Sequence, residues 1–97
     1  MATYTFIMDY LGGTYVRQIK ASNPRGAMKK GVEAMEPAVV TGLGQKLKEL
    51  LIHDLSWQDE PTPIEGMTNV WASHASARGK FATLTLVQTE VTKAGVK

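Results

Sequence analysis

The chain has 97 residues, 43% of them hydrophobic, and eleven basic and nine acidic side chains give a net charge of +2 at pH 7. This length and composition allow one buried core without disulfides or metal ions to stabilise it. The absence of cysteine excludes thiolate catalysis and cysteine-ligated metal sites, and the charge is far below that of a dedicated nucleic-acid arm.

The first elements are two strands that form a hairpin. Residues 3–8 alternate apolar and polar side chains, which is typical of a strand with one buried face. Gly12-Gly13 supplies the positive φ angles that a tight turn needs. Residues 15–21 form a second, more polar strand, and we place it at an edge of the sheet because edge strands are commonly charged.

Two helices are predicted in the middle of the chain. Asn23-Pro24 is typical of a helix start, so the first helix should cover residues 24–36. Gly31 weakens this helix and indicates a close approach to the sheet. A second helix over residues 43–53 carries four leucines on one face, and Leu47 among them should be buried.

The last part of the chain contains a loop and a second hairpin. Residues 56–66 are acidic and contain two prolines, which predicts a surface loop, with Trp57 and Ile64 as its anchors. Residues 67–75 and 80–88 are predicted as strands on either side of a turn.

Together these elements predict an α+β fold with the element order ββααββ. The two most apolar strands, the first and the last, should be central, which gives a single four-stranded antiparallel sheet of order 2-1-4-3 with two helices on one face. We expect one domain over residues 1–97, with a frayed tail at 91–97. No apolar run approaches the length of about 20 residues that spans a membrane, so we expect a soluble, cytoplasmic protein.

A sheet with helices on one face leaves its other face open. That face should form a half-apolar patch of a size more typical of an interface than of a monomer surface. It could also be covered by the 55–66 loop and the C-terminal tail. We predict a small non-enzymatic binding protein that acts through homo-oligomerisation, most simply as a homodimer, or through a protein partner. The predicted interface residues are Thr5, Ile7, Trp71, Thr83, Thr85 and Val87.

A group of basic residues near the start of the first helix suggests an alternative function. Cations and free backbone N–H groups at a helix start bind phosphate, so this group could bind nucleic acid or another phosphate. A solvated surface, with Lys29 paired to Glu33, also accounts for it. The residues of this alternative site are Arg17, Lys20, Arg25, Lys29 and Lys30.

Small-molecule chemistry has little support in the sequence. Neither His53 nor His74 has the spacing of a metal ligand or of a nucleophile's base, so we predict no catalytic residue, no metal and no cofactor. A ligand site between sheet and helices, lined by Phe6, Met28 and Met35 among others, is a third possibility, but methionines at helical spacing are more typical of a core.

Overall fold

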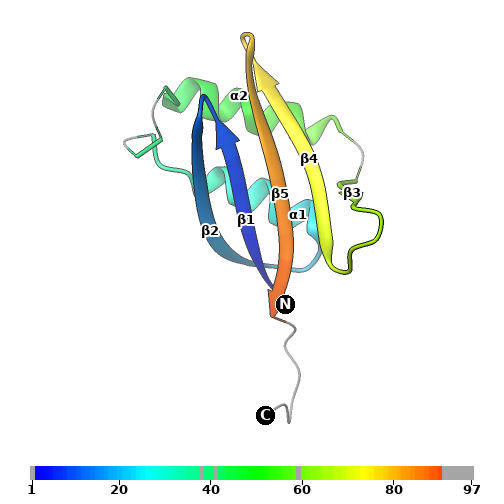
Figure 1. Cartoon of the computed structure of the whole chain (residues 1–97). Helices are drawn as coiled ribbons and strands as arrows, with labels where there is room; N and C mark the ends of the chain where they lie inside the picture. The colour runs from blue at the N-terminus through cyan, green and yellow to red at the C-terminus, as the bar shows by residue number, and fades with distance from the viewer. Residues whose placement is uncertain (1, 38, 41, 59, 91–97) are drawn as a thin grey trace.

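The computed structural model describes residues 2–37, 39–40, 42–58 and 60–90. The predicted frayed tail at 91–97 lies outside these residues. Five strands form one antiparallel sheet of order β2-β1-β5-β4-β3, and both helices lie behind one face of it (Figure 1). The elements are β1 (Ala2–Tyr10), β2 (Gly13–Ala21), α1 (Pro24–Glu33), α2 (Gln45–Ser56), β3 (Thr62–Pro63), β4 (Val70–Ala77) and β5 (Lys80–Glu90).

The predicted α+β class with a single antiparallel sheet and two helices is confirmed, and the four long strands have the predicted order. The prediction of four strands is wrong, because β3 adds a fifth at the edge beside β4. β3 has only two residues, Thr62 and Pro63, which pair with Ala72 and Trp71. Two residues show no alternation, and a proline is tolerated only where its missing N–H is not needed, so the sequence predicted a loop here.

Two-residue turns fix the register of both hairpins. Leu11 and Gly12 join β1 to β2 with φ angles of 48° and 84°, and Arg78 and Gly79 join β4 to β5 with φ angles of 52° and 79°. Positive φ at both positions is typical of a type I′ turn, whose twist matches that of the strands. The first turn is therefore one residue earlier than predicted, and Gly13 already belongs to β2.

The core lies between the sheet and the helices. Alternate side chains of β1 are buried, and Phe6 and Met8 among them are 0% exposed. A methyl group added at Gly31 of α1 would overlap the Phe6 ring, so the predicted close approach of this helix to the sheet is confirmed. The predicted helix start is also confirmed, because the Asn23 side chain accepts a hydrogen bond of 2.7 Å from the Gly26 N–H.

The second helix differs from its prediction at both ends. α2 begins at Gln45 and ends at Ser56, so Leu43 precedes the helix, although it is buried. Leu51 is buried but Leu47 is only half-buried, and the helix packs mainly against β4 and α1. The prediction that Trp57 anchors the following loop is wrong, since this side chain is 78% exposed. Neither helix of the described residues is long and apolar enough to span a bilayer.

Candidate functional site

The open face of the sheet, opposite the helices, carries an apolar strip across the four long strands. No helix of the described residues crosses this face (Figure 1). Ile7 of β1 lies opposite Val16 of β2, and Val87 of β5 lies opposite Val70 of β4. Opposed residues of antiparallel strands share a face, and Ile7 and Val87 are diagonal neighbours on β1 and β5. These four side chains, hereafter the apolar strip, are therefore contiguous. Val16 is 52% exposed and the others are half-buried.

Polar and aromatic side chains surround the apolar strip. Asp9 lies at one end of the face, where its carboxylate accepts a hydrogen bond of 2.6 Å from the Thr14 hydroxyl. Lys20 lies at the other end of β2, opposite Thr3. On the β4–β5 side, the His74 ring stacks on Phe81 with centroids 5.5 Å apart and an interplanar angle of 23°. The open face thus has an apolar centre, a carboxylate at one end and an ammonium group at the other.

The strand register puts five of the six predicted interface residues on this face, whereas their role as an interface stays a prediction. The five are Thr5, Ile7, Thr83, Thr85 and Val87.

The prediction that Trp71 lies on the open face is wrong. Trp71 pairs with Leu86, whose side chain is in the core, so it lies on the helix-covered side. There it packs edge-on against Tyr4, with ring centroids 6.0 Å apart. β4 contains small residues on both faces, so hydrophobic periodicity does not show which of its side chains face the core. The turn at Arg78-Gly79 decides this, because it fixes the register of β4 against β5.

Sequence reasoning missed two members of the apolar strip, Val16 and Val70. Val16 was overlooked because β2 was interpreted as a polar edge strand. The signal was the turn, since closing the hairpin with the two residues Leu11 and Gly12 puts Val16 opposite Ile7.

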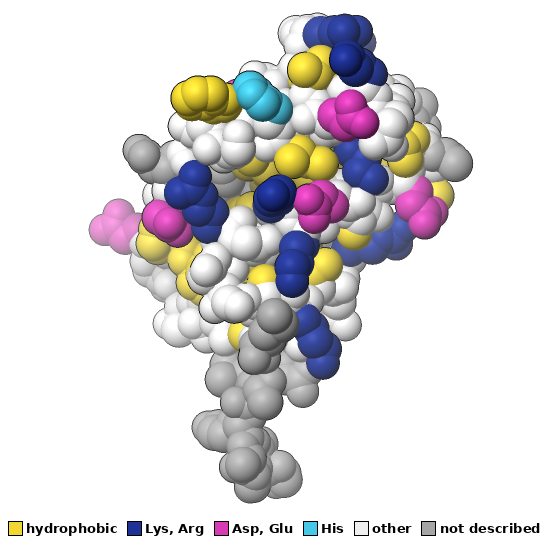
Figure 2. Space-filling model, turned by 180° about the vertical axis from the view of Figure 1, so that it is seen from behind, with side chains coloured by type: hydrophobic (Ala, Val, Ile, Leu, Met, Phe, Trp, Pro, Cys, Tyr) yellow, Lys and Arg dark blue, Asp and Glu magenta, His cyan; other side chains and the backbone are white. Residues whose placement is uncertain are grey.

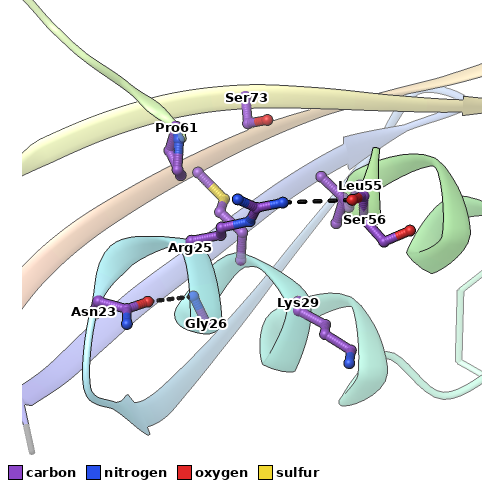
Figure 3. A pocket seen from close by; sticks show the side chains of 9 residues that line it. Asn23, Arg25, Gly26, Lys29, Leu55, Ser56, Pro61 and Ser73 are labelled. Atoms are coloured by element: carbon purple, nitrogen blue, oxygen red, sulfur yellow. Dashed lines mark hydrogen bonds between the residues drawn. The ribbon is translucent and has the colours of Figure 1, made fainter. Parts of the chain in front are cut away.

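A pocket of about 310 Å³ lies between the start of α1, the end of α2, Pro61 and β4 (Figure 3). Arg25 and Lys29 line it, but the Arg25 guanidinium donates a hydrogen bond of 3.4 Å to the Ser56 carbonyl oxygen and lies 3.8 Å from the Glu60 carboxylate. Lys29 points away from this guanidinium (Figure 3). The two cations of the pocket therefore do not converge on one point.

The five basic residues of the predicted phosphate site are not brought together. Arg17 and Lys20 lie on opposite faces of β2, because Arg17 is opposite the core residue Phe6 and Lys20 is opposite Thr3. The Lys30 ammonium group donates a hydrogen bond of 3.0 Å to the Lys20 carbonyl oxygen. Basic side chains are spread over the helix-covered side, with acidic and hydrophobic side chains between them (Figure 2).

A polar network joins the end of α2 to the edge of β4, beside a second cavity of about 300 Å³. The Gln58 amide donates to the Asp54 carboxylate at 3.1 Å and to the His74 carbonyl oxygen at 2.7 Å. Its oxygen accepts from the Ser73 hydroxyl at 3.2 Å, and Asp54 also accepts from the Ser76 N–H at 2.9 Å. This network holds α2 against the sheet, and nothing in the sequence pattern indicated it.

Three further features bear on catalysis, metal binding and a ligand site between the sheet and the helices. The Nε2 atom of His53 accepts a hydrogen bond of 3.1 Å from the Trp57 indole N–H. Within the described ranges, no three histidine, aspartate or glutamate side chains are grouped closely enough to hold a metal ion. Met28 and Met35, predicted as lining a ligand site, are 2% and 1% exposed and belong to the core cluster, and Met28 also lines the pocket of about 310 Å³ beside Arg25.

The sequence matches no model of a known protein family, and comparisons with curated proteins and with solved structures find no significant match.

Proposed function

We propose that the protein is a small non-enzymatic binding protein that forms a homodimer by packing the open faces of two sheets together. The observation that supports this proposal is the apolar strip of Val16, Ile7, Val87 and Val70, which runs across four strands and is not covered by a helix of the described part. Contiguous apolar surface of this kind is typical of an interface.

The distribution of charge on the face supports a second copy as the occupant. Lys20 and Asp9 lie at opposite ends of the face, on neighbouring strands. A twofold axis across the strands, midway between the levels of Thr5 and Ile7, would bring Lys20 of one copy close to Asp9 of the other. Ile7 and Val16 lie on one side of this axis and Val87 and Val70 on the other, so the two apolar strips would cross at the centre of the interface. The face is thus complementary to itself, as the interface of a twofold dimer must be.

The area of the face suggests a dimer of modest affinity. Four strands about 4.8 Å apart, each with about eight residues of ~3.3 Å, give a projected area of roughly 500 Å² per copy, or about 1,000 Å² in total. Stable interfaces bury roughly 1,200–2,000 Å². We therefore expect a dissociation constant in the micromolar range.

The test is the oligomeric state of two matched variants. Val16 lies on the open face, and Val39 lies in the segment that connects α1 to α2. The two valines are similarly exposed, at 52% and 56%, so they form a matched pair. Light scattering over a concentration series should report twice the chain mass of 10.6 kDa for the unmodified protein. Val16→Lys should shift the protein to a monomer, because it would bury an ammonium group in the interface, whereas Val39→Lys should remain a dimer.

A monomer at every concentration, or two variants that behave alike, would refute the proposal. Trp71→Lys is not a suitable variant, because Trp71 packs against the core and its replacement would destabilise the fold as well as change the surface.

Phosphate or nucleic-acid binding at the start of α1 is the second candidate function. The position of Arg25 and Lys29 beside a pocket of about 310 Å³ favours it, but Glu60 already neutralises Arg25. Fluorescence anisotropy with labelled RNA and DNA in low salt tests it. Binding that is lost on Arg25→Ala with Lys29→Ala, with a flatter salt dependence, would favour this function over dimerisation.

A further inference from the structure

The two edges of the sheet differ in how their backbone groups are paired. At the β4 edge, β3 pairs with one half of the strand. Beyond β3, the side chains of Gln58 and Asp54 bind the His74 carbonyl oxygen at 2.7 Å and the Ser76 N–H at 2.9 Å. One side chain of α2 and one from the segment just after it thus take the place of a strand, and this edge is closed to further pairing.

The β2 edge is open along most of its length. Tyr10 and Gly13 flank the two-residue turn, so they form a hydrogen-bonded pair, and every second residue of β2 beyond them bonds to β1. The backbone groups of Thr14, Val16, Gln18 and Lys20 therefore point away from the sheet. Among the described residues, the Lys30 ammonium group on the Lys20 carbonyl oxygen is the one partner found at this edge.

The charge of the β2 edge favours one kind of occupant. Arg17 and Lys20 are exposed on opposite faces of the strand, Lys30 reaches its end, and β2 contains no acidic residue. A second copy of β2 would place like charges side by side, and lysines on an edge strand disfavour such pairing. An extended segment with carboxylates would meet a cation on each face.

We propose that the edge of β2 is a docking site for an extended acidic segment of another protein, which adds to the sheet as a further strand next to β2. The backbone groups of Thr14, Val16 and Gln18 supply the hydrogen bonds, and Arg17 and Lys20 select acidic side chains. The proposal does not depend on the homodimer, because the backbone groups of the edge point sideways from the sheet, whereas the dimer is formed by the open face. Lys20 belongs to both surfaces, and Arg17 to the edge alone.

The test uses the full chain labelled with ¹⁵N and two capped nine-residue peptides, one of three Glu-Glu-Thr repeats, which places glutamates on both faces of a strand, and the other of three Lys-Lys-Thr repeats. In the free protein, the amides of Thr14, Val16 and Gln18 should exchange rapidly with solvent, whereas the paired Ser76 amide should exchange slowly. The glutamate peptide should slow exchange at the three β2 amides and leave Ser76 unchanged. The lysine peptide should not bind.

Charge reversal separates the edge from the open face. Arg17 lies on the helix side of β2 and outside the open face. Arg17→Glu should weaken binding of the glutamate peptide about fivefold, since an exposed ion pair becomes a repulsion, and should allow the lysine peptide to bind. Lys46→Glu makes the same change of net charge on the exposed surface of α2 and should leave both affinities unchanged.

Several results would overturn the proposal. They are equal binding of both peptides, no binding of either at millimolar concentration, and protection of amides elsewhere than on β2. Protection of the β2 amides that rises with protein concentration in the absence of peptide would identify a second copy as the occupant instead.

Discussion

Gly31 of α1 packs against Phe6 of β1 with no space for a side chain, so Gly31→Ala should destabilise the protein. The added methyl group would overlap the Phe6 ring, which is 0% exposed and part of the core cluster. Alanine in place of glycine favours a helix by about 1 kcal/mol, whereas overpacking a core costs about 1–3 kcal/mol. Overlap with the ring itself places the cost at the upper end. We therefore expect the free energy of unfolding to fall by about 2 kcal/mol.

Urea denaturation at a fixed protein concentration measures this change. Trp71 is half-buried against the core and reports unfolding by fluorescence, and circular dichroism provides an independent signal. For a domain whose stability is about 5–15 kcal/mol, a loss of about 2 kcal/mol moves the midpoint clearly. The m-value should not change, because the surface exposed on unfolding is the same.

Gly26→Ala in the same helix is the matched control. Its methyl group would meet one atom, the Asn23 side-chain oxygen at 3.3 Å, and a shift of a few tenths of an ångström would relieve this contact while the capping hydrogen bond to the Gly26 N–H is kept. We expect its stability to change by less than about 0.5 kcal/mol. Phe6→Leu replaces the ring with a smaller side chain and so relieves the overlap. Gly31→Ala should therefore cost at least about 1 kcal/mol less in that background. A Gly31→Ala variant as stable as the unmodified protein would refute the close-packing argument.

Two further predictions concern the core. Leu84 is 0% exposed and Leu47 is half-buried, so Leu84→Ala should cost about 2–5 kcal/mol and Leu47→Ala clearly less; equal melting temperatures for the two variants would contradict the observed facing of α2. Burial raises the pKa of Tyr4 and Tyr10 above the usual value of 10.0, so the folded state retains phenol protons that the unfolded state loses. Stability should therefore be constant below about pH 10 and fall as the pH rises above it, and urea midpoints that stay constant from about pH 9 to about pH 11 would contradict this.

The main features of the fold could be predicted because they depend on local patterns. The alternation in β1 and the apolar residues of β5 identified the two central strands, and the order of the long strands followed from them. Asn23-Pro24 identified the start of α1, because capping and the fixed proline φ angle act within one helical turn. The open face could be predicted because two helices on one face of a sheet leave its other face uncovered.

The details of the candidate sites could not be predicted, because they depend on which distant residues are opposed. One residue of register moves a side chain to the other face of a sheet, so Trp71 was placed on the wrong face although its strand was correctly identified. The apolar strip has the same origin, since Val16 and Val70 belong to it only through their partners on β1 and β5.

The sequence by itself therefore determined the elements, their approximate bounds and the antiparallel sheet with helices on one face, because capping, turn chemistry and hydrophobic periodicity act over a few residues. The tertiary structure decided the partners. It added β3 to the edge, closed the β4 edge with Asp54 and Gln58, left the β2 edge open and separated the basic residues onto different faces. These features depend on backbone groups and side chains that meet across 8 to 22 residues of sequence, further than one helical turn or one tight turn reaches, so local patterns do not indicate them.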